Sequence, residues 1–210
     1  GMATDVGHDE TDSAKFTSES RQQYEDYAYQ GNHVAAGFAK ALIATYYGKP
    51  TARAYFHGCS NGGRDALMVA RRFPEDYDGI IAGAPAAGWS RLMTSFAWNA
   101  QAARSAPNLK SKLGTIQAAV IAKCDSLDGV KDQLLENPAE CQFEPKNLQC
   151  RGVDGPNCLS AEEVSALRRI YGGPRLGDGS AVYAGMPVGG EALPARRGPV
   201  PGCGRVPPAA

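Results

Sequence analysis

The sequence predicts an α/β fold, in which a parallel sheet is followed by a region of helices and cysteine-rich loops. Two apolar segments, 52–57 and 79–84, have strand character, and a helical pattern over 66–73 lies between them. A strand, a helix and a second strand in this order form parallel neighbours joined by a right-handed crossover. We therefore expect a first domain over 1–88 and a second over 89–191.

The first domain opens with a strand end at 2–5, and a polar loop continues through Ser20. A long helical pattern then covers 22–47. The apolar residues on one face of this pattern are Tyr27, Val34, Phe38 and Leu42. The segment 79–84 contains a continuous apolar run, which is typical of a strand buried on both faces.

The second domain has helical patterns in place of alternating strands. They cover 89–104, 113–123 and 161–171. Ser160 precedes the last of them and Glu163 follows three residues later, a spacing that predicts a capping box. The first of these helices carries Trp89, Phe96 and Trp98, which are either helix core or the wall of a pocket; we favour helix core.

The segment Gly58-Cys59-Ser60-Asn61-Gly62 stands between the first strand and the following helix. In a nucleophile elbow, a sharp turn from strand to helix presents a serine hydroxyl at the edge of a sheet. We expect both glycines because such a turn leaves no space for a Cβ on either side of the serine. The alternative is a structural serine in a tight turn. The strand before it and the helix after it favour Ser60 as a nucleophile.

The residues around this serine resemble a known family. The segments 55–68 and 72–86 closely resemble the tannase and feruloyl esterase family of α/β-hydrolases, and the resemblance runs from about Ala3 to about Glu191. It implies a partial α/β-hydrolase core for the first domain, and for the second part of an inserted lid that shapes the substrate pocket.

The resemblance also implies an activity, namely a carboxylic ester hydrolase that cleaves feruloyl, galloyl or similar small aromatic esters. Ser60 would form the acyl-enzyme, and the main-chain N–H of Asn61 would donate to the oxyanion. A second donor is expected in a loop after an earlier strand, and that segment is not present in this sequence.

The histidines do not follow the pattern of this fold, in which the triad order is Ser, Asp, His. The three histidines, His8, His33 and His57, all precede Ser60. The closest, His57, is three residues away at a strand end, where packing is its commoner role. We therefore expect the catalytic Asp and His to be missing from this chain, and the chain alone to be inactive.

Six cysteines raise the question of disulfides. Cys124, Cys141, Cys150 and Cys158 cluster in a region rich in Asp, Asn, Gly and Pro, which suits disulfides across loops with little core. No Cys-x-x-Cys pair occurs, which argues against zinc. Four cysteines allow three pairings, so the sequence alone leaves the connectivity open.

The family resemblance adds a pairing to these cysteines. It implies disulfides between Cys124 and Cys141 and between Cys150 and Cys158. It also implies that Cys59 pairs with a cysteine beside the catalytic histidine, and we expect that partner to be missing. Cys203 is a poor replacement because no histidine adjoins it. Cys59 is therefore expected either to be a free thiol or to pair aberrantly.

Three aspartates at offsets of three and four, with a glycine between them, form a second chemical signal at 124–134. Calcium accepts carboxylate and backbone carbonyl oxygens, but the spacing is not that of an EF-hand. A solvated acidic turn is the alternative. The resemblance implies a structural Ca²⁺ held by the side chains of Asp125, Asp128 and Asp132 and by the carbonyls of Val130 and Leu134.

Composition limits the remaining possibilities. The 210 residues are 43% hydrophobic and 21% charged, with no net charge, so a sizeable core is expected. Nothing suggests nucleic acid or an anionic membrane as a partner, and no apolar run is long enough to cross a bilayer. No signal peptide is visible, yet the cysteines favour a periplasmic or secreted protein. The oligomeric state is not indicated.

The last segment, 192–210, is rich in Pro, Gly and Arg and has no helical or strand periodicity. We expect it to be disordered or aberrant, as in a truncated or frame-shifted product of a longer gene.

Two other functions remain open. A non-catalytic, calcium-stabilised domain of the same fold would bind a ligand or partner without an activated serine. A different hydrolase with the same elbow, such as a peptidase or lipase, would lack the calcium loop.

Overall fold

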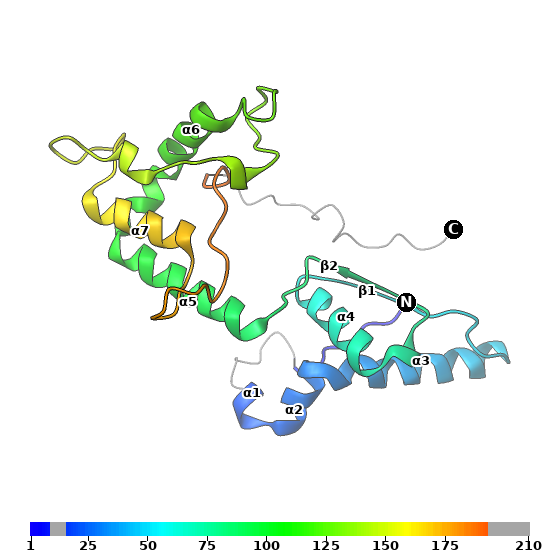
Figure 1. The fold of residues 1–210 in the computed structure, drawn as a ribbon. Coiled ribbons are helices and arrows are strands. Elements are labelled where there is room, and N and C mark those ends of the chain that lie inside the picture. Colours follow the sequence, from blue (N-terminus) through cyan, green and yellow to red (C-terminus); the bar gives the residue numbers. More distant parts are fainter. Residues whose placement is uncertain (9–15, 193–210) are drawn as a thin grey trace. The chain divides into compact units, whose positions relative to one another are not determined.

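The structure, a computed structural model, describes residues 1–8 and 16–192 (Figure 1). Two compact units divide the described residues, one ending at Ala87 and the other beginning at Gly88. The predicted tail lies outside the described residues from position 193 onward. No helix of the described residues is long and apolar enough to cross a membrane.

The first unit contains a nearly continuous helical segment over residues 16–47. Its parts are α1 (Phe16–Glu19), α2 (Arg21–Glu25), the π-helical turn η1 (Asp26–Gln30) and α3 (Gly31–Tyr47). The prediction of a helix over 22–47 is confirmed, although α1 occupies part of the expected polar loop. Gly48 ends α3 in the left-handed region with a φ of 67°. Val34, Phe38 and Leu42 are 56%, 61% and 56% exposed, so their shared face is not buried among the described residues.

No strand forms at 2–5 in the described part of the chain, contrary to the sequence prediction. A turn follows this segment instead. The backbone N–H groups of the turn donate hydrogen bonds to side chains and not to a neighbouring strand. The Val6 N–H donates to Thr4 Oγ1 at 3.2 Å, and the Gly7 N–H donates to Asp5 Oδ1 at 3.0 Å.

The sheet of the first unit contains two parallel strands, which confirms the predicted α/β fold class. Strand β1 (Tyr55–Cys59) pairs with β2 (Gly79–Gly83), so that Cys59 lies opposite Gly83. Helix α4 (Asn61–Arg72) and the turn η2 (Pro74–Asp76) connect them. The buried side chains of α4 include Ala66 and Val69.

Strand β2 is not buried on both faces as its apolar run predicted. Ile81 is 62% exposed, and the register places it opposite His57, which is also exposed. Tyr55, two residues before His57, is exposed on the same face. Among the described residues, nothing buries this face of the two strands.

The second unit is built from helices and short 3₁₀ turns, as predicted. They are α5 (Trp89–Ser105), η3 (Pro107–Lys112), α6 (Leu113–Cys124), η4 (Pro138–Glu140), η5 (Pro145–Leu148) and α7 (Ala161–Gly172). The predicted capping box is present at the start of α7, where Ser160 Oγ accepts from the Glu163 N–H at 3.2 Å. Trp89 and Phe96 are exposed, contrary to our preference for helix core.

The core of the second unit lies among its three helices. Its buried apolar members include Ala102, Leu109, Ile116, Val120, Leu159 and Leu167. Disulfides join Cys124 to Cys141 and Cys150 to Cys158, the pairs implied by the family resemblance.

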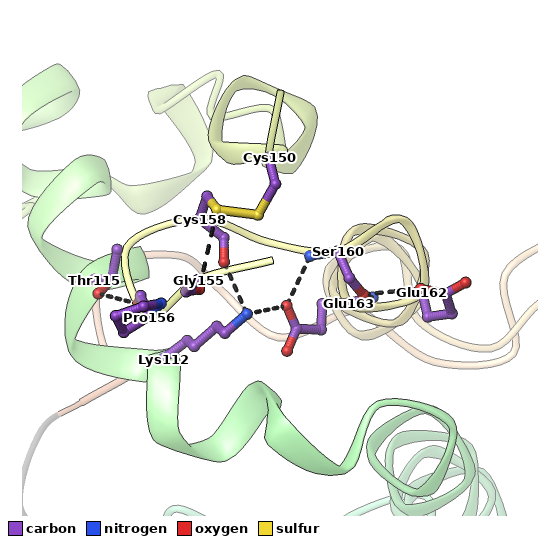
Figure 2. The surroundings of a disulfide bond; sticks show 9 residues. All are labelled: Lys112, Thr115, Cys150, Gly155, Pro156, Cys158, Ser160, Glu162 and Glu163. Atoms are coloured by element: carbon purple, nitrogen blue, oxygen red, sulfur yellow. Dashed lines mark hydrogen bonds and ion pairs between the residues drawn. A yellow bond between two sulfur atoms is a disulfide. The ribbon is translucent and has the colours of Figure 1, made fainter. Parts of the chain in front are cut away.

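A buried ion pair lies beside the second disulfide. Figure 2 shows Lys112 Nζ between the Cys158 carbonyl, at 2.8 Å, and Glu163 Oε2, at 2.6 Å. Glu163 Oε2 also accepts from the Ser160 N–H at 2.8 Å. One lysine therefore ties the disulfide loop to the N-terminus of α7.

Candidate active site

Ser60 stands at the turn between β1 and α4 in a rare backbone conformation. Its φ of 59° and ψ of −113° lie in a region that residues other than glycine seldom occupy. Three hydrogen bonds hold this strained residue. Its N–H donates to the Gly83 carbonyl at 3.0 Å, and its own carbonyl accepts from the N–H groups of Arg64, at 3.1 Å, and Ala86, at 3.0 Å.

The Ser60 hydroxyl is not used to cap the helix. A serine at the N-cap usually accepts a hydrogen bond from the second or third N–H group of its helix. Ser60 makes no such bond, and it is exposed. A strained, exposed serine between a strand and a helix has the geometry of a nucleophile elbow.

The glycines around Ser60 differ in how much space they have. A Cβ on Gly58 would lie 2.1 Å from the Gly62 carbonyl oxygen, and one on Gly63 would lie 2.4 Å from the Gly83 carbonyl oxygen. Nothing lies within 4 Å of the Cβ position of Gly62. The expectation that Gly62 is required for space is therefore wrong, because the close approach occurs one residue later, at Gly63.

Asn61 is the first residue of α4, so its N–H has no acceptor within the helix. The positive end of the helix dipole also favours a developing negative charge near this N–H. The Asn61 side chain is held from two sides. Its Oδ1 accepts from Arg64 Nε at 2.8 Å and from the Tyr27 hydroxyl at 3.2 Å.

Arg64 is a residue of the site that sequence reasoning missed. Its side chain is only 11% exposed, and it forms an ion pair with Asp65 Oδ1 at 2.5 Å. Burial raises the pKa of the Asp65 carboxyl, and the neighbouring Arg64 opposes that rise. Asp65 is therefore the counterion of Arg64. The available signal was an arginine directly after the adjacent glycines Gly62 and Gly63.

None of the three histidines is hydrogen-bonded to Ser60 among the described residues. His33 Nδ1 lies 2.6 Å from Asp76 Oδ2, and the His33 ring stacks on Phe73 with centroids 4.0 Å apart. His57 lies within β1 and lines a cavity with residues of α3. His8 packs edge-on against Tyr27, at 5.3 Å between centroids.

The aspartates of the predicted calcium loop accept hydrogen bonds from the backbone of the same loop. Asp125 Oδ1 accepts from the Gln133 N–H at 2.7 Å. Asp128 Oδ1 accepts from Val130 N–H at 2.9 Å, and Asp132 Oδ1 accepts from Leu134 N–H at 3.1 Å. Their chemistry suits calcium, but within residues 1–8 and 16–192 no three acidic, histidine or cysteine side chains are gathered as a metal site.

For Cys59 the sequence left two alternatives, a free thiol or an aberrant pair. It is disulfide-bonded. The residue beside Ser60 is thus covalently tied, and the predicted free thiol is not found.

A family model for tannase and feruloyl esterase matches residues 1–204. The chain belongs to this family. It is 37% identical over 188 residues to an uncharacterized esterase of Xanthomonas campestris pv. campestris, a match that covers 87% of this chain and 33% of that protein. It is 34% identical over 199 residues to a probable feruloyl esterase B-2 of Aspergillus flavus, covering 90% and 37%.

A solved structure supports the fold of this family member. The crystal structure of feruloyl esterase B from Aspergillus oryzae aligns with a TM-score of 0.72 and 28% identity, covering 82% of this chain and 36% of that one. The chain therefore spans about a third of the length of the relatives it matches. Its sheet and helices are part of an α/β-hydrolase fold.

Proposed function

We propose that this chain carries the nucleophile of a serine carboxylic ester hydrolase that cleaves small aromatic esters. The observation that carries the proposal is the strained, exposed Ser60 at the turn from β1 to α4, whose hydroxyl makes no helix-cap bond. Relatives named as feruloyl esterases support an aromatic acyl group.

In the proposed reaction, Ser60 Oγ attacks the ester carbonyl carbon while a histidine accepts the hydroxyl proton. The Asn61 N–H donates to the oxyanion of the tetrahedral intermediate. Collapse of the intermediate expels the alcohol, which takes up the proton, and leaves an acyl group on Ser60. Water then hydrolyses this acyl-enzyme.

We propose that the base and its aspartate are not supplied by this chain, which alone is inactive. The positions of His8, His33 and His57 support this, because none is hydrogen-bonded to Ser60 in the described part of the chain. A base from solution can substitute for a missing histidine. Imidazole should therefore restore hydrolysis of a short aryl ester that depends on Ser60.

The experiment compares the purified chain with Ser60→Ala, with and without imidazole. The expected result is no difference between them without imidazole and faster turnover by the unaltered chain with it. If the unaltered chain hydrolysed the ester without imidazole and Ser60→Ala abolished that turnover, the proposal that the chain alone is inactive would be wrong. Equal rates in every arm, with no fluorophosphonate labelling of folded chain, would favour a non-catalytic domain. Feruloyl, galloyl and acetyl esters of one alcohol then test the acyl preference.

We further propose that the loop after α6 binds one structural Ca²⁺ through Asp125, Asp128 and Asp132, with carbonyl oxygens from Val130 and Leu134. The support is the hard oxygen donor set on one short loop. Calcium should raise the melting temperature of the chain, and Asp125→Asn should remove the increase. Asp154→Asn, an exposed change in another loop, is the control. An unchanged melting temperature with calcium in excess contradicts this site.

Two disulfides in the second unit support a proposed location in an oxidising compartment, the periplasm or outside the cell. Expression in such a compartment should give more folded protein than expression in a reducing cytoplasm. Equal yields of folded, fully reduced chain in the cytoplasm would count against it.

A further inference from the structure

Arg64 connects the elbow to a helical turn more than thirty residues earlier in the chain. Its Nη2 donates to the Tyr27 carbonyl at 2.8 Å, and its Nη1 donates to the Ala28 carbonyl at 3.2 Å. The guanidinium carbon also lies 4.4 Å from the centroid of the Tyr27 ring. With Nε on Asn61, each nitrogen of the side chain has an acceptor.

The two carbonyl acceptors of Arg64 lie in the π-helical turn Asp26–Gln30. Single π turns within helices are rare and frequently occur at functional sites. This turn contributes two carbonyl oxygens to Arg64 and, through the Tyr27 hydroxyl, one donor to Asn61. Arg64 and the π turn thus both donate hydrogen bonds to the Asn61 side chain.

Holding the side chain of Asn61 also holds its main chain. Asn61 Oδ1 accepts two hydrogen bonds from different directions, which fixes the orientation of the side chain. The main-chain N–H of the same residue belongs to the peptide unit of the strained Ser60, whose carbonyl accepts from the Arg64 and Ala86 N–H groups. The bonds to the side chain therefore add to these backbone bonds in restraining the direction of this N–H.

We propose that Arg64 is a positioning residue, which fixes Asn61 so that its main-chain N–H points to the place where the oxyanion develops. The catalytic meaning of this arrangement rests on the proposed function, whereas the fixing of Asn61 does not. Lysine cannot replace Arg64, because one ammonium cannot reach three acceptors that match the planar fork of a guanidinium. Asp65 balances the buried charge.

The test uses the whole 210-residue chain labelled with ¹⁵N. In the unaltered chain, the Asn61 N–H should have an order parameter near that of rigid backbone, about 0.85. Arg64→Lys and Arg64→Met should lower it to about 0.6 or less. Arg72→Met is the matched control, because Arg72 lies in the same helix and stacks on Tyr29 at 4.2 Å. The control should leave the Asn61 order parameter unchanged.

A second pair of variants covers the case in which Arg64 variants do not fold. Tyr27→Phe removes one of the two donors to Asn61 and keeps the ring, while Tyr29→Phe is its control. Tyr27→Phe should lower the Asn61 order parameter by less than Arg64→Met does. A rigid Asn61 in folded Arg64→Met, or in Tyr27→Phe if Arg64→Met is unfolded, overturns the proposal.

Reactivity then separates the proposal from the function on which it rests. Arg64→Lys should reduce the imidazole-dependent turnover at saturating ester by about a hundredfold with little change in KM, since one oxyanion donor is worth about that much. If the unaltered chain shows no reaction that depends on Ser60, the proposed function fails while the order parameters still decide the role of Arg64. A parallel loss in Arg72→Met would show that the effect is not specific to the fixing of Asn61.

Discussion

The two units of this chain are stabilised in different ways. The continuous cluster of buried apolar side chains lies wholly in the second unit, together with both described disulfides. The buried apolar residues of the first unit, among those described, are only Ala36, Ala66 and Val69. Yet the first unit holds Ser60 in its strained conformation. The candidate nucleophile and the bulk of the core therefore lie in different units of the chain.

The difference shows how the first unit maintains a strained turn with few buried apolar residues. A strained residue persists only where its surroundings restrain it in several ways. Here the restraints are polar: three backbone bonds at Ser60 and the contacts of Arg64 with the π turn. Exposed apolar faces on α3 and β2 contribute little. We expect the first unit to unfold before the second.

Fluorescence can distinguish the two units, because both tryptophans of the chain, Trp89 and Trp98, lie in the second unit. Tryptophan emission therefore reports on that unit alone, whereas far-UV circular dichroism reports on both. We expect two melting transitions by dichroism, of which only the later one is seen in fluorescence. Coincident transitions by both probes would show that the units unfold together.

The largest expected effect is from Lys112→Met in the second unit. Lys112 and Glu163 are 9% and 5% exposed in their side chains and lie 2.6 Å apart. Removing the lysine leaves a buried carboxylate without its counterion, which costs about 3–5 kcal/mol of stability. The tryptophan transition should shift far down in temperature, and the first transition should remain in place.

The matched double variant is Lys112→Met with Glu163→Gln, which removes both charges. It should recover a large part of the loss, because no unpaired charge is left buried. A single variant as stable as the unaltered chain would show that the carboxylate is hydrated, and that the second unit does not depend on this pair.

The next effect is from replacing both Cys124 and Cys141 by Ala. This disulfide connects the end of α6 to a buried position 17 residues later. Its loss should cost about 2–4 kcal/mol, observed again in the tryptophan transition. Reduction of the unaltered chain, which also opens the Cys150–Cys158 disulfide, should give a shift at least as large. No shift in either case would mean that the noncovalent core alone accounts for the stability of the second unit.

The sequence predicted the order of elements well because local patterns determine them. The apolar runs of β1 and β2, the helical spacing of α4 and the capping box before α7 are all short-range signals. Exposure was predicted less well. Ile81 and Phe38 belong to strongly apolar segments, but burial depends on what packs against a face, and periodicity does not contain that information.

The elbow shows, for single residues, the same limit of prediction from local sequence patterns. The motif located Ser60 and Gly58, because a sharp turn after a strand has a recognisable spacing. It did not predict that Gly63 makes the close approach, or that Arg64 reaches the π turn. Both depend on backbone segments far apart in the sequence, Gly83 and Tyr27.

Two glycine variants test the restraint of the elbow and should have smaller effects. Gly58→Ala places a Cβ against the backbone oxygen of Gly62, which cannot move without distorting the turn. We expect a loss of about 1–3 kcal/mol in the first unit. Gly62→Ala meets open space within a helix, where alanine is favoured over glycine by up to about 1 kcal/mol.

The measurement for this pair is the dichroism transition that tryptophan fluorescence does not share. Opposite shifts in the two variants are expected, with the fluorescence transition unchanged in both. Equal tolerance of alanine at positions 58 and 62 would contradict the close contact between the strand end and the first turn of α4.

The smallest expected effect is on the pH dependence of stability, and it comes from a contact between the residues that precede the two strands. Asp78 accepts from the Ala54 N–H and from Arg53 Nη1, each at 2.8 Å, and these bonds, the backbone one foremost, lower the pKa of its carboxyl. Because the pKa of this carboxyl is lower in the folded chain than in the unfolded chain, its ionised form stabilises the fold at pH values above the ordinary pKa of 3.8. This stabilisation is lost as the pH falls through the lower, folded pKa. Asp78→Asn should therefore lower the first transition slightly at neutral pH and match the unaltered chain in stronger acid. Glu75→Gln, an exposed change in the same unit, is the control. A protonated Asp78 carboxyl no longer carries the charge that strengthens its hydrogen bonds to Ala54 and Arg53. If the stability difference between Asp78→Asn and the unaltered chain persisted in strong acid, the effect would therefore come from packing.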